Sequence, residues 1–368
     1  MEIVDTTPDG QIREWGPAQP PEGPTRRRRS FRITRSKKML VGLVLLSIFV
    51  LVAIIGPMIA PYDPNQVGMP LEGPPLPGTS FPSQQPGPQH WLGQTTIGAD
   101  IFSQLLAGTR PTVIVAFMAG LLATLLSVVI GITAGLIGGW VDEFLSVLTN
   151  VFLVVPALPL LIAIGAFLGP ETTGNPVVVS LIIALTGWAW GARVIRAQTL
   201  SSRARDFIEA ARITGEKTSR IIFAEILPNL GAVIASSFLF TTIYAIGTYV
   251  GLGFLTVVAP GPNYNWGTML FDATSSSAVA SGMWWWYIPP GLAIAILGTS
   301  LALINFGIDE YINPRLRTVT GSKAARKRFG RKLPPQLGFT PVARTTVGTR
   351  QRAAAGGPSG PANAGVAG

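Results

Sequence analysis

The side chains that carry most enzyme chemistry are nearly absent from this sequence. Its 368 residues include no cysteine and a single histidine, His90, which excludes disulfides, thiolate nucleophiles and the usual cysteine–histidine metal sites. Residues 215–218 read Gly-Glu-Lys-Thr, a partial likeness to a phosphate-binding loop, but that motif also requires an upstream glycine and an adjacent Gly-Lys pair. We therefore expect no catalytic residue, no metal ligand and no cofactor bound by this chain.

The polar residues that do cluster lie between residues 201 and 228. Ser201 and Ser202 are suitable N-caps for a helix that has Asp206 and Glu209 in its first turn. Gly215 suits the C-terminal stop of that helix, where a positive φ is needed. An apolar stripe recurs at helical spacing, formed by Ala204, Phe207, Ile208 and Ala211. The pattern predicts an amphipathic helix that ends at a glycine.

A second short helix follows this glycine. It is expected to start near Thr218 or Ser219 and to run towards Pro228, whose ring should end it. A connection of this length and composition exceeds what is needed to join two elements. Adjacent Ala210 and Ala211 would let another protein surface approach closely. Two interpretations remain open from the pattern alone: a docking element for a partner, and an amphipathic helix that lies flat on a bilayer.

The elements around this loop are strongly apolar. Hydrophobic residues make up 48% of the chain, charged residues only 12%, and the mean hydropathy is +0.43, which points to an integral membrane protein. Six apolar stretches, none of which contains a charged residue or histidine, are predicted to span the membrane: 39–60, 112–137, 144–168, 177–191, 231–255 and 286–308. The fourth is short and must extend through residues 192–200. The fold class is therefore an all-α membrane protein.

The basic residues predict the orientation of these spans. Nine lysines and arginines precede the first span, seven lie between the fourth and fifth, and eleven follow Pro314. With six spans, all three groups fall on one side, which the positive-inside rule makes cytoplasmic. We therefore expect both termini inside, and we interpret the net charge of +10 as a topology signal and not as a sign of nucleic-acid binding. The first span is too long for a cleaved signal peptide and is expected to remain as an anchor.

The composition also divides the chain into segments. Residues 1–38 form a basic, largely disordered tail, 39–60 the first span, and 61–111 a proline-rich external linker with a short amphipathic helix. Residues 112–317 form the core with its loop at 201–228, and 318–368 form a second disordered tail. Within the core, Pro156 and Pro159 either kink the third span to shape a cavity or merely fit helix packing. Residues 284–286 are three tryptophans, expected to form an interfacial anchor, and His90 is expected to form hydrogen bonds within its loop.

Several short motifs together resemble a known family. Glu209-Ala210-Ala211, Gly215 and Leu227-Pro228 resemble the EAA signature of ABC-importer permease subunits. Further motifs resemble the C-type subunit of the dipeptide and oligopeptide permease family: His90-x-Leu92-Gly93, Gly98-x-Asp100, Gly108-x-Arg110, residues 138–143, Trp266-Gly267, Pro290-Gly291 and residues 313–317. The resemblance covers residues 39–317. The chain departs from the family pattern at Gln94, Thr95 and residues 256–258.

The resemblance implies a fold, a function and partners. The fold would be that of an ABC type I importer permease in a bacterial cytoplasmic (inner) membrane, and this chain would form half of the translocation pathway of a peptide importer. Glu209, Ala210, Ala211, Gly215, Leu227 and Pro228 would couple it to partner ATPases. The implied partners are a second homologous permease, two cytoplasmic ABC ATPase subunits or domains that bind ATP and magnesium, an extracytoplasmic substrate-binding protein and the lipid bilayer.

Other functions remain as alternatives. The same family includes importers for oligosaccharides and nickel complexes. An ion-coupled carrier would need acidic residues within its spans, and a membrane scaffold would bind partners without ATP-dependent flux. The absence of charge in the predicted spans makes the carrier the weaker alternative.

Overall fold

The computed structural model describes residues 37–74, 84–258 and 264–312. It divides into a unit spanning Met1–Ile308 and a second unit, Asp309–Gly368, of which only the end of the last helix is described. The predicted tails and the motif at residues 313–317 lie outside the described residues. In the described part, the regular elements are helices, and the only bridge pairs Gln94 with Asp100.

Five described helices are long and apolar enough to cross a membrane. Their bounds are α1 Lys37–Ile59, α2 Ile101–Ile137, α6 Pro176–Arg203, α9 Leu227–Phe254 and α11 Trp284–Ile312. The predicted extension of the short fourth span is confirmed, since α6 continues through residues 192–200. The segment expected to hold a separate short helix before residue 112 is instead the first part of α2. Pro111 lies inside that helix.

The predicted third span is broken. Helix α3 (Gly139–Val154) and helix α4 (Ala157–Leu168) meet at 84°, and they count as a sixth span only if the bent pair is taken together. Pro156 is the N-cap of α4 and has no N–H to continue the hydrogen-bond ladder of α3. Of the two alternatives left open for these prolines, the structure therefore supports a kink, and residues 144–168 form two helices. A short helix, α5 (Pro170–Thr173), follows α4.

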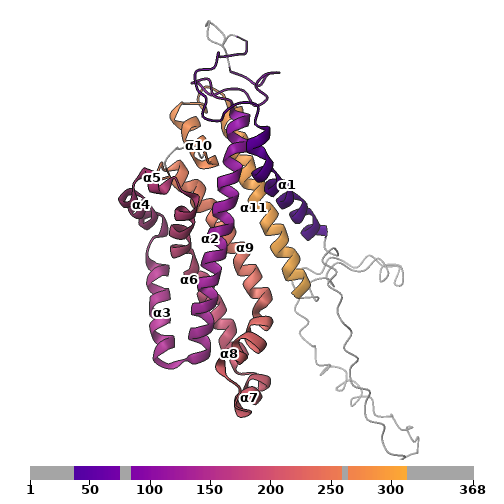
Figure 1. The fold of residues 1–368 in the computed structure, drawn as a ribbon, viewed down its shortest axis with the longest axis vertical. Helices are drawn as coiled ribbons and strands as arrows, with labels where there is room; N and C mark the ends of the chain where they lie inside the picture. Colours follow the sequence, from indigo (N-terminus) through magenta and orange to yellow (C-terminus); the bar gives the residue numbers. More distant parts are fainter. Residues whose placement is uncertain (1–36, 75–83, 259–263, 313–368) are drawn as a thin grey trace, which may run out of the picture. The chain divides into compact units, whose positions relative to one another are not determined.

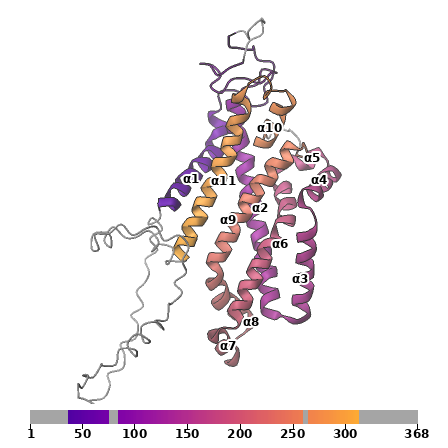
Figure 2. The same ribbon diagram turned by 180° about the vertical axis from the view of Figure 1, so that it is seen from behind.

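Helix α2 is the centre of the first unit and packs against α1, α6 and α9 (Figures 1 and 2). Two glycines allow it to approach α6 closely. A Cβ atom built on Gly131 would lie 2.7 Å from the carbonyl oxygen of Ala192, and one on Gly135 would lie 2.7 Å from Cβ of Thr199. Between the same helices, the Ser127 hydroxyl donates a hydrogen bond of 2.6 Å to the carbonyl of Trp188. Small residues thus let the two helix backbones approach closely. Close packing of this kind holds helices together in a membrane, where the hydrophobic effect between them is weak.

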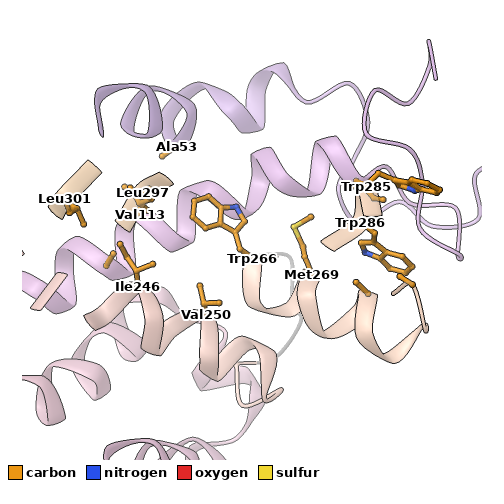
Figure 3. Close-up of a cluster of buried hydrophobic side chains, with 14 of the residues drawn as sticks. Ala53, Val113, Ile246, Val250, Trp266, Met269, Trp285, Trp286, Leu297 and Leu301 are labelled. Atoms are coloured by element: carbon orange, nitrogen blue, oxygen red, sulfur yellow. The ribbon is translucent and has the colours of Figure 1, made fainter. Parts of the chain in front are cut away.

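A large hydrophobic cluster joins α10 (Trp266–Ser275) to the long helices (Figure 3). Trp266 and Met269 of α10 are fully buried against residues of α2, α9 and α11. Trp285 and Trp286 at the start of α11 belong to the same cluster and are only 5% and 2% exposed. The predicted aromatic anchor at residues 284–286 is therefore wrong for two of the three tryptophans, because only Trp284 is exposed.

The connections gather at two opposite ends of the first unit. The short helices α7 (Asp206–Ile213) and α8 (Thr218–Arg220) lie at one end, and α10 and the segment before α2 lie at the other (Figures 1 and 2). The 201–228 loop is thus separated by the length of the spans from the motifs around His90 and Trp266.

Candidate functional site

The loop predicted to dock a partner forms a short helix outside the bundle. Helix α6 continues to Arg203, so Ser201 and Ser202 lie in its last turn and are not the N-caps that we predicted. Arg205 is the N-cap of α7, and its carbonyl accepts hydrogen bonds from the amides of Ile208 and Glu209. Asp206 and Glu209 do lie in the first turn of α7, where their negative charge interacts favourably with the helix dipole.

Gly215 ends α7 as predicted. Its φ is +78°, a left-handed conformation that glycine adopts without the steric cost of a Cβ atom. The amide of Gly215 donates to the carbonyl of Arg212, and the amide of Glu216 donates to that of Ala211, both at 3.0 Å. These two bonds form a Schellman motif, which satisfies the last carbonyls of the helix. The direction in which the chain leaves α7 therefore depends on the backbone freedom of Gly215.

The second half of the loop differs from the expected short helix. Helix α8 begins at Thr218, as predicted, but it continues through a π-helical segment, Ile221–Ile226, into α9. Pro228 lies in the first turn of α9 and does not end the preceding helix. Its missing N–H is accommodated because the amide of Leu227 donates to the carbonyl of Ile222, five residues earlier. The loop is therefore joined to α9 by continuous helical backbone.

The inner side of the loop is anchored in the bundle. Ile208 is fully buried, and Ile221 and Ile226 are 3% and 0% exposed. They form a cluster with residues of α2, α6 and α9, namely Ile132, Leu136, Ile195 and Leu230. Ala211 and Leu227 pack against this cluster from its edge. Burial of several aliphatic side chains at this point holds α7 against the ends of α2 and α6.

The outer side of α7 presents an uncovered surface, which we call the α7 face: Phe207, Glu209, Ala210 and Ile213. All four residues are exposed, and Ile213 is 81% exposed. Of the two adjacent alanines, only Ala210 lies on this surface, because Ala211 packs against the bundle. Sequence reasoning missed Ile213, although its spacing from Glu209 and Phe207 places it on the side opposite Ile208. Phe207 and Ile213 leave two large apolar side chains exposed on this short helix.

An ion pair links two helices near the same end. The guanidinium of Arg196 in α6 donates from Nε to Oδ1 of Asp142 at 2.5 Å and from Nη2 to Oδ2 at 2.7 Å. Asp142 lies in the first turn of α3, and its side chain is 19% exposed. This bidentate geometry fixes the angle between the two helices as well as their separation.

We expect Arg196→Ala to destabilise the chain by about 1–3 kcal/mol, because it leaves a half-buried carboxylate without its charged hydrogen-bond donor. Thermal unfolding in detergent would measure the change. The exchanged pair, Asp142→Arg with Arg196→Asp, should recover part of the loss. The control is Arg193→Ala, which removes a neighbouring exposed arginine that does not contact Asp142. An equal loss of stability in this control would contradict the assignment.

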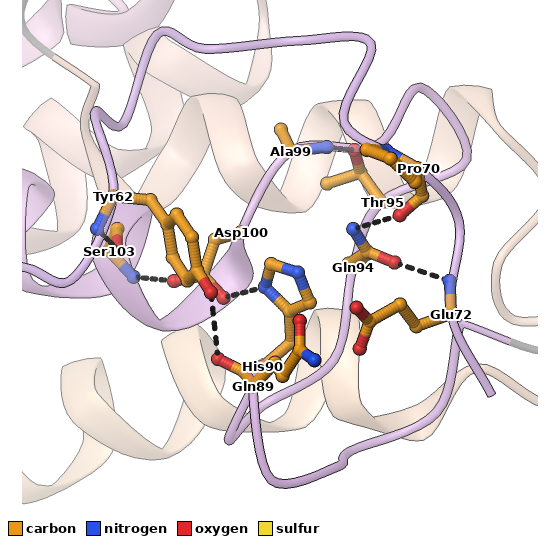
Figure 4. A network of polar contacts seen from close by, with 10 residues as sticks. All are labelled: Tyr62, Pro70, Glu72, Gln89, His90, Gln94, Thr95, Ala99, Asp100 and Ser103. Carbon is orange, nitrogen blue, oxygen red and sulfur yellow. Dashed lines mark hydrogen bonds and ion pairs between the residues drawn. The ribbon is translucent and has the colours of Figure 1, made fainter.

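A buried polar network organises the opposite end (Figure 4). Nδ1 of His90 and Oδ1 of Asp100 are 2.8 Å apart, and the Tyr62 ring stacks on His90 with centroids 4.7 Å apart. Oδ2 of Asp100 accepts from the amide of Ser103 and so caps α2. The expectation that His90 forms hydrogen bonds within its loop is confirmed. Asp100 therefore ties the loop to the first turn of α2.

The same network contains one of the family departures. In the side chain of Gln94, Nε2 donates to the carbonyl of Pro70 at 3.0 Å, and Oε1 accepts from the backbone amide of Glu72 at 2.9 Å. Thr95 is also buried and accepts a hydrogen bond from the amide of Ala99. Gln94 thus fastens residues 70–72 to the turn that precedes α2, and Thr95 closes that turn by its bond to Ala99.

Helix α10 completes this end. It begins with a capping box in which Asn265 and Thr268 exchange hydrogen bonds. Burial raises the pKa of the Asp272 carboxyl above its usual value. Burial and the nearby Asp272 carboxylate both raise the pKa of the Tyr264 phenol. The Asp272 carboxyl and the Tyr264 phenol therefore lie near each other at this end.

The sequence matches two family models. The model described as the binding-protein-dependent transport system inner membrane component matches residues 127–318. The model described as the N-terminal TM domain of oligopeptide transport permease C matches residues 27–75. The first match covers just over half of the chain and contains the whole 201–228 loop.

Individual relatives are similar over most of their length. A putative peptide transport system permease protein of Brucella suis is 34% identical over 291 residues, 78% of this chain and 90% of the relative. A dipeptide transport system permease protein of Alkalihalophilus pseudofirmus is 30% identical over 78% of this chain and 89% of the relative. An oligopeptide transport system permease protein of Mycobacterium tuberculosis is 28% identical over 64% of this chain and 79% of the relative. A chain in a solved structure of the MetNI methionine ABC transporter, in inward-facing conformations, aligns with this protein at a TM-score of 0.46 and 17% sequence identity. The alignment covers 57% of this chain and 95% of that chain.

Proposed function

This chain belongs to the family of binding-protein-dependent transport system inner membrane components, and from that premise we propose that it is one permease half of an ATP-driven importer for peptides. It is a multi-pass protein of the inner membrane and a transport subunit. The names of its relatives, which include dipeptide and oligopeptide permeases, support peptides as the cargo over oligosaccharides or nickel complexes.

The observation that carries the proposal is the α7 face. Helix α7 is anchored to three spans on its inner side, through Ile208. On its outer side the α7 face exposes Ala210 and Ile213 at the end of the bundle. A surface built this way can transmit a movement of a partner to the spans. We propose that one of the importer's two cytoplasmic ABC ATPases binds here, and that the two ATPases, and not this chain, bind ATP and magnesium. Glu209, Ala210, Ala211, Gly215, Leu227 and Pro228 together form and position this coupling element.

The remaining partners and the orientation belong to the same proposal. A second permease would complete the pathway, and an extracytoplasmic binding protein would deliver peptide at the end that carries α10 and the His90 network. The 201–228 loop and both termini would be cytoplasmic, which agrees with the arginines and lysines on the loop, such as Arg205, Arg212 and Lys217.

We expect Ala210→Trp to abolish binding of the ATPase subunits, because the indole would occupy the surface that must be approached closely. The measurement is co-purification of the ATPases with the tagged chain, together with ATP-dependent uptake of a labelled peptide into proteoliposomes that contain all partners. Ala280→Trp is the matched control, since Ala280 is exposed at the opposite end.

The outcomes separate the parts of the proposal. Loss of ATPase binding and uptake in Ala210→Trp alone would support it. Full ATPase binding by Ala210→Trp would overturn the assignment of the α7 face. Uptake of an oligosaccharide but of no peptide by the unmodified complex would overturn the substrate and leave the coupling intact.

A further inference from the structure

The broken third span opens a cleft in the side of the bundle. The cleft has a volume of about 480 Å³ and is lined by three segments that are distant in sequence: the break between α3 and α4, α6 and α9. Its lining includes Pro156, Thr186, Gly187, Trp190, Phe240 and Tyr244. A volume of this size falls within the range of small-molecule binding sites.

The cleft lies near the middle of the spans. Thr186 and Trp190 are in the central part of α6, which runs from Pro176 to Arg203. Phe240 and Tyr244 are in the central part of α9, which runs from Leu227 to Phe254. Because both helices are longer than the hydrocarbon core at 1.5 Å per residue, their middle residues lie within that core.

The cleft contains polar groups, and the Thr186 hydroxyl donates to the carbonyl of Ile183 at 3.0 Å. The hydroxyls of Thr186 and Tyr244 lie 3.3 Å apart, within hydrogen-bond distance, and the tyrosine is 37% exposed. At the break, Pro156 has no backbone N–H, so the hydrogen-bonded backbone of α3 ends within the membrane-spanning part of the bundle. The last carbonyl groups of α3 are therefore not paired with amides of the same helix. Broken helical backbone at the bilayer centre is found where it is buried in protein or faces a water-filled cavity.

The apolar groups of the cleft form an aromatic wall. The rings of Trp190 and Phe240 meet edge to face, with centroids 5.9 Å apart, and the two side chains are 52% and 49% exposed. Gly187 leaves room for Tyr244, since a Cβ there would lie 3.2 Å from the tyrosine ring. Among the described residues, none that lines the cleft is charged. The surface therefore offers stacking and a few neutral hydrogen bonds, without a charge that would hold a cargo tightly.

We propose that this cleft is the part of the translocation pathway that contacts the peptide midway through the membrane. The Trp190–Phe240 ring pair contacts apolar side chains of the cargo, and the Thr186–Tyr244 hydroxyl pair and the open carbonyls of the break contact its backbone amides. This inference rests on the proposed function, and it names the residues along which the cargo moves. It also assigns a role to the 84° break, which positions the end of α3 as one wall of the cleft.

The test uses the absence of natural cysteine in this chain. Thr186→Cys places one thiol in the cleft with little change in volume. Leu185→Cys is the matched control, because Leu185 is the preceding residue of α6, is 45% exposed and does not line the cleft. Each variant is reconstituted with all partners, exposed to a charged, water-soluble methanethiosulfonate reagent, and analysed by mass spectrometry of this chain. Co-purification of each variant with all partners before labelling shows that the variant is folded and assembled.

We expect the reagent to label the thiol of Thr186→Cys and not that of Leu185→Cys. We also expect labelling of Thr186→Cys to slow severalfold when the binding protein delivers peptide in the presence of ATP. Labelling of this variant without protection by peptide would overturn the contact with cargo. Its reaction only with a lipid-soluble maleimide would show a lipid-facing surface. A thiol that reacts in the isolated chain but not in the assembled complex would show that the sister permease covers the cleft. The last two results also overturn the proposal.

The hydroxyl pair has a second, functional readout. Tyr244→Phe keeps the ring but removes one hydrogen-bonding group, and we expect it to lower uptake of a short peptide by about two- to tenfold, the usual effect of one hydrogen bond. Tyr287→Phe, which removes a hydroxyl from a residue outside the cleft, should leave uptake unchanged. Equal uptake by both variants would overturn the role of the hydroxyl pair. If the unmodified complex imports no peptide at all, the proposed function fails instead, so the two failures are distinguishable.

Discussion

We expect Gly215→Val to abolish ATP-driven peptide import while the chain still inserts and folds. Gly215 has a φ of +78°, a conformation that costs an L-residue about 1–2 kcal/mol and is especially unfavourable for a β-branched one. That cost is too small to unfold the bundle. It is large enough to change the Schellman turn, because that turn is defined by two backbone hydrogen bonds, one of which Gly215 itself donates. The change would re-aim α7 relative to α8.

The controls separate backbone strain from bulk. A Cβ atom on Gly215 would meet nothing within 4 Å, so the substitution creates no clash of this atom within the chain. Gly215→Asn should retain most import, since asparagine tolerates this conformation better than other residues. Gly282→Val introduces the same strain, at φ +73° and also in open space, but at the other end of the bundle. Loss of import in Gly282→Val and Gly215→Val alike would contradict a specific role for Gly215.

The second large effect concerns folding. We expect Gly267→Ala to prevent α10 from packing on α9, because the added Cβ would overlap the backbone carbonyl of Val250. A backbone atom within a long helix cannot move aside on its own, and overpacking of this kind costs about 1–3 kcal/mol or more. Trp266, which donates to the carbonyl of Leu105 at 3.3 Å, would lose its place in the cluster of Figure 3.

Thermal stability in detergent measures this effect. Gly251→Ala is the matched control, because it adds the same methyl group to α9 at a position with nothing within 4 Å. A clear fall in Tm for Gly267→Ala, with little change for Gly251→Ala, is the expected result. Equal Tm values for the two variants would show that α9 and α10 can separate without cost.

Much of the fold was predictable because spans and charges leave strong local signals. Apolar runs of about 20 residues identified the long helices, and Gly215 was recognised as a helix stop because few residues other than glycine favour a positive φ. The predicted family and its peptide importer function are confirmed by the matched family and the named relatives. The role of the six loop residues in coupling stays a prediction.

The errors have physical causes that a local pattern does not contain. Residues 284–286 read as an interfacial anchor, but the packing of α10 buries Trp285 and Trp286. Ser201 and Ser202 are good caps, yet α6 continues past them because its own packing extends the helix. The size of the bend after Val154 depends on where α4 packs, so prolines at 156 and 159 indicated a kink without its angle.

The π segment has a consequence for the helical register between the loop and α9. Buried Leu230 and Ile226 are four residues apart, as on one face of an α-helix, whereas Ile226 and Ile221 are five apart. One residue is in effect inserted, and in an α-helix one residue corresponds to a rotation of about 100°. The π segment takes up that rotation. The buried sides of the loop and of α9 therefore face the same core, although the spacing of their buried residues differs by one residue.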